Sequence, residues 1–300
     1  MKRLVYAMFI MLLTIGQLGC QEKKEQVESS QQSAKFEING LSSPESIVSD
    51  GVYYYVSNIG EKPDPMAKDG DGLISKISKD GKIIQKGFIE GLNAPKGMAI
   101  IDGTIYATDI DRVAGFDLKT KEKKLEIIID GTVFLNDLTV LNNNSLIVSA
   151  TDINKLFELD LGKSSYSEIK IAGQINGPNG IWYDKNKNQL YVCGMGVNNK
   201  PNGSVGIIDL STNQYKALTD YTGMLDGLAL IDQSTVLFSN WVALGPEGII
   251  NKLNIDTKEI TKIDLQGIAG PADFYYNNET KQLWIPELLE NKILVVTIDR

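Results

Sequence analysis

The sequence predicts an all-β protein folded as a six-bladed β-propeller with four antiparallel strands in each blade. Three observations predict it. Six segments repeat one pattern, in which a turn precedes a short apolar strand and a second turn leads into a second strand. The repeats recur about every 45 residues, the spacing of four-stranded propeller blades. Helical periodicity is weak from Lys35 onward, so helices do not explain the pattern.

The six repeats account for almost the whole chain after residue 34. Their openings lie at residues 43–48, 94–99, 134–139, 177–182, 224–229 and 270–275. A second strand follows at 52–57, 104–108, 146–149, 189–193, 235–239 and 282–285. Each repeat continues into further β-rich stretches, as at 73–77 and 82–88 in the first. Each repeat therefore supplies the strands of one blade.

The last repeat is one strand short. It ends with the stretch 292–298, while residues 35–38 form a β-rich stretch ahead of the first repeat. Propellers protect their sheet edges because an open edge invites pairing with another chain. We therefore expect residues 35–38 to pair beside 292–298 as the outer strand of the sixth blade.

The N-terminus has the features of a bacterial lipoprotein signal. Lys2 and Arg3 precede an apolar run at 4–15, and Gly19 stands just before Cys20. We interpret residues 1–19 as a signal peptide and residues 20–34 as a lipidated Cys20 with a flexible polar tether, followed by the propeller at 35–300. The expected location is the cell envelope, on its periplasmic or extracellular side, with the membrane contacted only through the lipid. Ordinary cleavage to a free periplasmic protein is the alternative.

Charge and cysteine content exclude some classes of function. The formal net charge is −8, which makes nucleic acid an improbable partner. With Cys20 lipidated, Cys193 has no disulfide partner, and the chain contains no histidine that could activate a thiol. We expect Cys193 to be a buried, inert small hydrophobe, and the protein to be a monomer.

One position varies among the repeats while the flanking Pro and Gly recur. First strands line the channel of a propeller, so these residues should form a ring at one of its ends: Glu45, Lys96, Asn136, Asn179, Asp226 and Ala272. Two carboxylates and two amide carbonyls are hard oxygen ligands, which calcium prefers. We therefore expect a divalent metal, calcium first and zinc second. The alternative is that these are turn residues and that Lys96 neutralises Glu45 directly.

The chain resembles the regucalcin/gluconolactonase family, whose relatives include paraoxonases and strictosidine synthases. The resemblance covers residues 36–298 and is carried by 134–137 with 149–152, by 178–181, by 225–228, and by Pro44 with Glu45. It implies that Glu45, Asn179 and Asp226 are metal ligands. It also implies that Asn136 is a fourth ligand, as in paraoxonases, or contacts substrate, as in gluconolactonases. Because the histidine pair of paraoxonases is absent, the gluconolactonase branch fits better.

Two functions follow. The first is a calcium- or zinc-dependent lactonase or esterase-type hydrolase with Asp226 as the catalytic base, and with Lys96, Asn136 and Asp109 binding a lactone or sugar-like substrate. This requires a metal position open toward the long loops at 59–72, 195–203 and 241–247. The second is a non-catalytic propeller with a structural metal, binding a small ligand or a protein. Because propellers include both enzymes and binding proteins, the fold alone does not distinguish the two functions.

Overall fold

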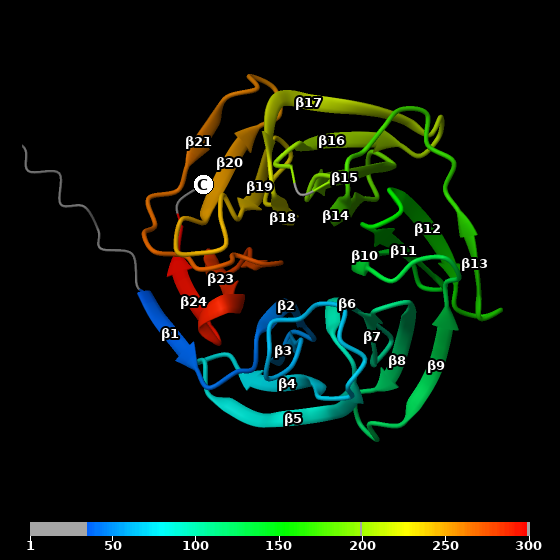
Figure 1. Ribbon diagram of the computed structural model, residues 1–300, viewed down its shortest axis with the longest axis vertical. Coiled ribbons are helices and arrows are strands. Elements are labelled where there is room, and N and C mark those ends of the chain that lie inside the picture. The colour runs from blue at the N-terminus through cyan, green and yellow to red at the C-terminus, as the bar shows by residue number, and fades with distance from the viewer. Residues whose placement is uncertain (1–34, 199, 299–300) are drawn as a thin grey trace, which may run out of the picture. The chain divides into compact units, whose positions relative to one another are not determined.

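The computed structural model describes residues 35–198 and 200–298, which belong to one compact unit. They form six separate four-stranded antiparallel sheets arranged around a central channel (Figure 1). Only one short 3₁₀ helix, η1 (Leu288–Glu290), interrupts the strands in this part of the chain. The predicted six-bladed, all-β architecture is confirmed.

Each blade takes its strands in chain order from the channel outward. Blade 1 contains β2 (Pro44–Ser49), β3 (Tyr53–Asn58), β4 (Gly72–Ser78) and β5 (Ile83–Leu92). Blade 2 contains β6 (Pro95–Ile101), β7 (Thr104–Asp109), β8 (Arg112–Asp117) and β9 (Lys123–Ile128). Blade 3 contains β10 (Leu135–Asn142), β11 (Ser145–Ala150), β12 (Lys155–Asp160) and β13 (Ser165–Glu168).

The second half of the chain repeats this plan, except that the last blade borrows a strand. Blade 4 contains β14 (Pro178–Asp184), β15 (Gln189–Gly194), β16 (Gly203–Asp209) and β17 (Gln214–Gly223). Blade 5 contains β18 (Leu225–Leu230), β19 (Thr235–Asn240), β20 (Ile249–Asn254) and β21 (Ile260–Lys262). Blade 6 contains β22 (Tyr275–Asn277), β23 (Gln282–Glu287), β24 (Lys292–Thr297) and β1 (Lys35–Asn39).

Strand β1 closes the ring as expected. It pairs antiparallel with β24, from Lys35 opposite Val296 to Asn39 opposite Lys292, and the two strands lie side by side in Figure 1. The Lys292 ammonium adds ion pairs to Glu290 at 2.6 Å and to Glu37 at 3.2 Å. The N-terminal strand is therefore the outer edge of blade 6.

The apolar cores lie between neighbouring blades, because a second strand is covered on both faces by the adjoining sheets. Every residue of β11 and of β19 is buried. At the seam where blade 6 meets blade 1, the buried Trp284 stacks on Tyr54 with ring centroids 4.0 Å apart. Phe36 of β1 meets the same indole edge-on at 6.0 Å. Trp284 is therefore a packing residue that joins blade 6 to blade 1 and to strand β1.

The expected signal peptide (1–19), the Cys20 lipidation site and the tether (20–34) lie outside the described residues and stay predictions. Within the described ranges, no helix is long and apolar enough to cross a membrane.

Candidate functional site

The ring residues are placed by a β-bulge that recurs in five blades. In each of these blades the first strand pairs with the second at its first residue, and pairing resumes three residues later, as between Pro44 and Ile47 or between Leu225 and Leu228. A bulge takes residues out of the ladder and redirects their side chains. The residues released at the first bulge position are the predicted ones: Glu45, Lys96, Asn136, Asn179 and Asp226.

The ring is buried and contains polar atoms that no protein group satisfies. The five polar side chains of the ring are between 1% and 4% exposed. Glu45 Oε2, Asp226 Oδ1 and both polar atoms of the Asn179 side chain have no hydrogen-bond partner among the described residues. An unpaired polar atom at such a depth costs on the order of 1–3 kcal/mol, and more if it is charged. A group absent from the polypeptide, such as a cation, would satisfy these oxygens.

The remaining contacts of the ring hold its side chains in place. The indole Nε1–H of Trp241 donates to Asp226 Oδ2 at 2.8 Å. The side-chain amide of Asn136 donates to Thr151 Oγ1 at 3.3 Å, and the Thr151 hydroxyl donates to the carbonyl of Pro178 at 2.8 Å. The Asn136 amide is therefore oriented with its nitrogen toward Thr151, which leaves Oδ1 as the end that could serve a cation.

The backbone of the ring is tied from blade to blade by donors on the second strands. The Ser149 hydroxyl donates to the carbonyl of Asn179 at 2.8 Å, and the Cys193 thiol donates to the carbonyl of Asp226 at 2.9 Å. Equivalent bonds join Thr108 to Asn136 and Ser239 to Ala272. Cys193 is buried and free, as expected, but it is also a donor that fixes the ring residue of the next blade.

Lys96 does not neutralise Glu45 through a direct ion pair. Its Nζ donates to the carbonyl of Ala94 at 3.0 Å and lies 4.9 Å from the centre of the Phe134 ring. Among the described residues, no carboxylate lies within 4 Å of this ammonium. Burial lowers the pKa of Lys96 to about 8, although the charge of Glu45 opposes this shift. The simple salt-bridge explanation of the ring is therefore not supported.

Both ring carboxyls have raised pKa values. Burial is the largest cause for Glu45, whose pKa lies well above its usual range, and the charge of Asp226 adds to the effect. Burial also raises the pKa of Asp226 to about 7, and the charge of Asp273 adds to it, while the indole donor of Trp241 and the nearby Asn179 side chain, which is close but outside hydrogen-bond geometry, oppose the shift. Carboxyls that hold protons because they lack a counter-charge would release them to a dication.

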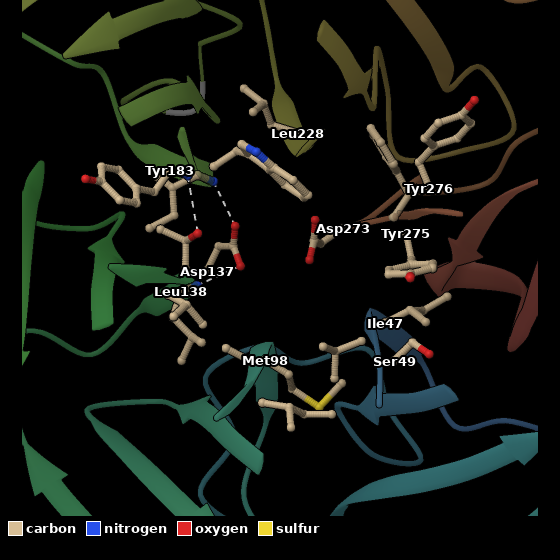
Figure 2. Close-up of a pocket in the computed structure, with 18 residues that line it drawn as sticks. Ile47, Ser49, Met98, Asp137, Leu138, Tyr183, Leu228, Asp273, Tyr275 and Tyr276 are labelled. Carbon is tan, nitrogen blue, oxygen red and sulfur yellow. Dashed lines mark hydrogen bonds between the residues drawn. The ribbon is translucent and has the colours of Figure 1, made fainter. Parts of the chain in front are cut away.

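A second tier of channel residues, not predicted from the sequence, lies one position further along each first strand. Figure 2 shows its two acidic members, Asp137 and Asp273, facing each other across the channel from blades 3 and 6. Asp137 accepts the backbone N–H groups of Leu138 at 2.6 Å and Ile181 at 2.7 Å. Asp273 Oδ2 accepts the hydroxyl of Ser46 at 2.6 Å. Ser46 is also a member of this tier, and the other three members are glycines: Gly97, Gly180 and Gly227.

Apolar residues from several blades pack together at the ring end of the channel. A cluster of buried apolar residues, Ile59, Ala94, Ile110, Ala272 and Leu288, is joined there by Trp241 and Leu289. Three of these belong to the loops that leave the second strands of blades 1, 2 and 5. We call this cluster the apolar cap.

Asp109 has a structural role at the same end of the channel. Its Oδ1 accepts the N–H groups of Asn93 at 3.0 Å and Ala94 at 2.9 Å, and its Oδ2 pairs with Arg112 at 2.7 Å. The side chain is fully buried. Both oxygens are therefore committed to local partners, which does not favour the predicted substrate contact.

The opposite mouth of the channel opens into a cavity of about 350 Å³. Its lining includes Asp137 and Asp273 of the second tier. Trp182, which is 41% exposed, and Tyr183 also line the cavity.

No set of three or more His, Cys, Asp or Glu side chains within residues 35–198 and 200–298 is placed to hold a metal ion. The ring has a different composition, since two of its four oxygen-bearing side chains are amides. Calcium accepts amide carbonyls as readily as carboxylates, whereas zinc prefers nitrogen and sulfur ligands. The donor set of the ring therefore fits calcium better than zinc.

No protein-family model matches the chain, and neither does any curated protein. Among solved structures, 1437 chains resemble it, so the fold is too widespread to identify a function. A protein of unknown function from Bacteroides thetaiotaomicron is 12% identical, with a TM-score of 0.66 over 89% of this chain and 77% of that one.

Two further structures are similar. A chain in a nidogen–laminin complex is 17% identical, with a TM-score of 0.56 over 76% of this chain and 89% of that one. A chain described as the extracellular domain of a one-component system from B. thetaiotaomicron is 11% identical, with a TM-score of 0.56 over 86% of this chain but only 33% of that one. Similarity at these identities shows the propeller fold alone.

Proposed function

We propose that this chain is a non-catalytic, calcium-binding β-propeller of the cell envelope, in which the ion stabilises the channel and the propeller binds a ligand. The observation that carries the proposal is the set of unpartnered oxygens in a buried ring: Glu45 Oε2, Asn179 Oδ1 and Asp226 Oδ1. Asn136 would add a fourth oxygen. The resemblance to the regucalcin/gluconolactonase family supports the same four positions.

The burial of the ring side chains favours a structural ion over a catalytic one. A catalytic metal keeps a coordination position for water or substrate, whereas a structural site is closed. The apolar cap and the Trp241 indole lie over the ring, and all its polar side chains are buried. Attachment to a membrane through Cys20 is the accompanying proposal for its location, supported by the lipoprotein-like N-terminal sequence.

Calcium should raise the melting temperature of the purified protein and should be released by a chelator. At a concentration one hundred times the Kd, a ligand that binds only the folded state adds about 2.7 kcal/mol of stability. For a domain of this size that corresponds to a shift of about 5–10 °C. Asp226→Asn and Glu45→Gln should abolish the shift, while Glu259→Gln, which removes an exposed carboxylate, should keep it. A wild-type protein that ignores calcium would rule out the site.

A lactonase is the second candidate, because Asp226 and Lys96 have pKa values near 7 and near 8, as acid–base residues at neutral pH require. A calcium ion would supply polarisation of a lactone carbonyl. The Asp226 carboxylate would accept a proton from water, and Lys96 would bind the polar ring of the substrate. Both steps need the apolar cap to move away from the ring.

A panel of aldonolactones and aliphatic lactones, with and without calcium, separates the two candidates. The hydrolase would be favoured by turnover that a chelator inhibits and that Asp226→Asn abolishes. Lys96→Ala should then raise the KM. Absence of turnover in a protein that is stabilised by calcium supports the non-catalytic propeller.

A further inference from the structure

The cavity at the mouth opposite the apolar cap narrows through an apolar collar before it reaches the second tier. The collar consists of the first-strand residues next to that tier, each between 2% and 6% exposed: Ile47, Met98, Leu138, Ile181, Leu228 and Phe274. Figure 2 shows Ile47, Met98, Leu138 and Leu228 surrounding the opening. A group that enters the channel from this side therefore passes through a ring of hydrocarbon.

The floor of the cavity is acidic and has no cation of its own. Asp137 and Asp273 point at each other across it (Figure 2). No Lys or Arg of the described residues lies within 4 Å of either carboxyl group. Asp273 Oδ2 accepts the Ser46 hydroxyl, and no hydrogen bond to Oδ1 is present among the described residues. One carboxylate oxygen is thus left facing the cavity.

The two carboxyls are in an environment that favours a positively charged partner. Burial is the largest cause of the raised pKa of Asp273, about 7. A cation here would replace an uncompensated carboxyl pair with a neutralised one.

The apolar lining of the collar favours an organic cation. Hydrocarbon walls offer a metal ion no ligands, whereas they stabilise the apolar stem of an alkylammonium. Trp182 at the rim adds aromatic surface, which is characteristic of pockets for small organic ligands. The second tier also lacks the amide oxygens that the ring offers to calcium.

We propose that this cavity binds a small-molecule primary amine, with its ammonium between Asp137 and Asp273 and its apolar stem inside the collar. The inference supplies a ligand class for the proposed binding role and uses residues other than the four assigned to calcium. Asp273 is the main charge partner, because Asp137 already gives both of its oxygens to backbone donors.

Isothermal titration calorimetry of the mature protein with n-butylamine and n-hexylamine tests the proposal, with n-hexanol and hexanoate as probes of equal length. We expect one site per chain, tighter binding of hexylamine by about three- to fourfold for each added methylene, and no binding of hexanoate. Asp273→Asn keeps an acceptor for Ser46 and should weaken hexylamine at least tenfold. Glu259→Gln, which removes one exposed carboxylate, should bind hexylamine like wild type.

The calcium site is separated from the amine site by repeating the titration with Asp226→Asn and with chelator. If hexylamine still binds to Asp226→Asn and to wild type in chelator, the amine site is supported independently of the proposed ion. This holds whether or not calcium binds to wild type. Equal binding of hexanol and hexylamine, or equal hexylamine binding by Asp273→Asn and wild type, would overturn it. Loss of amine binding in Asp226→Asn with retention in Asp273→Asn would overturn it as well.

Discussion

Replacing Asp273 by Asn should make the calcium-free protein less sensitive to pH. The usual pKa of this group is 3.8, and burial raises it to about 7 in the folded protein. A carboxyl with a raised folded-state pKa stabilises the fold while it is protonated. That contribution is fully present below about pH 4 and is lost as the pH rises through 7. Because Asn cannot ionise and retains an acceptor for the Ser46 hydroxyl, the variant has no such loss.

The magnitude follows from the size of the shift. A difference of about 3 pKa units corresponds to about 4 kcal/mol in total, of which about 3 kcal/mol is lost between pH 5 and pH 8. Urea unfolding followed by tryptophan fluorescence, in chelator at both pH values, measures it. We expect Asp273→Asn to be as stable as wild type near pH 5 and more stable by a few kcal/mol near pH 8. A stability difference between the two proteins that does not change with pH would refute the reasoning.

Two further substitutions test how the ring is built, both read as free energies of unfolding in urea. Cys193→Ala leaves the carbonyl of Asp226 without its donor and should lower the free energy of unfolding by about 1–2 kcal/mol. Cys193→Ser keeps a donor and should lower it less. Equal losses of stability in the two variants would argue against the hydrogen bond. Gly180→Ala places a Cβ atom 2.2 Å from the carbonyl oxygen of Asp226 and should lower the free energy of unfolding by more than about 3 kcal/mol. Gly51→Ala has open space around its Cβ atom and is opposed only by a positive φ, so it should lower the free energy of unfolding by about 1 kcal/mol. Similar costs for the two glycines would contradict the close approach.

The fold was predictable because each repeat contains its own evidence. The turn at 49–51 and the alternation that follows it indicate two strands without any knowledge of the rest of the chain, and five similar segments multiply that evidence. Closure of blade 6 by β1 was predictable from the number of strands in each repeat, since the sixth repeat was one strand short. The equivalent placement of Glu45 and Asp226 on their first strands followed from the repeat position, but their burial did not.

Details that depend on contacts between blades were not predictable. The second tier is visible in the sequence as a set of equivalent repeat positions. Its mixture of Gly with Ser46, Asp137 and Asp273 has meaning only once blade 3 is seen to bond blade 4 and blade 1 to bond blade 6. Asp109 was assigned to substrate because it ends a second strand at the channel mouth, where loops often carry function. Its bonds to Asn93 and Ala94 depend on backbone geometry that the sequence does not specify.

The apolar cap was missed for a related reason. Ile59 and Ile110 follow second strands and could equally have pointed into solvent or into their own sheets. Ile110 adopts a positive φ of 62°, which is unfavourable for a β-branched residue and could not be anticipated from its sequence neighbours. Only the convergence of loops from several blades places these side chains over the channel.

The pairing of β1 with β24 also constrains how the molecule can fold. Lys292 and Glu37, which form an ion pair across this seam, are 255 residues apart in the chain. Contacts of such separation form late, because the entropy of closing the loop must be met first. During synthesis β1 leaves the ribosome first and has no partner until β24, nearly the last segment, has emerged. Five blades can assemble in order, but the circle, and with it the complete channel, is finished only when the two ends of the chain meet.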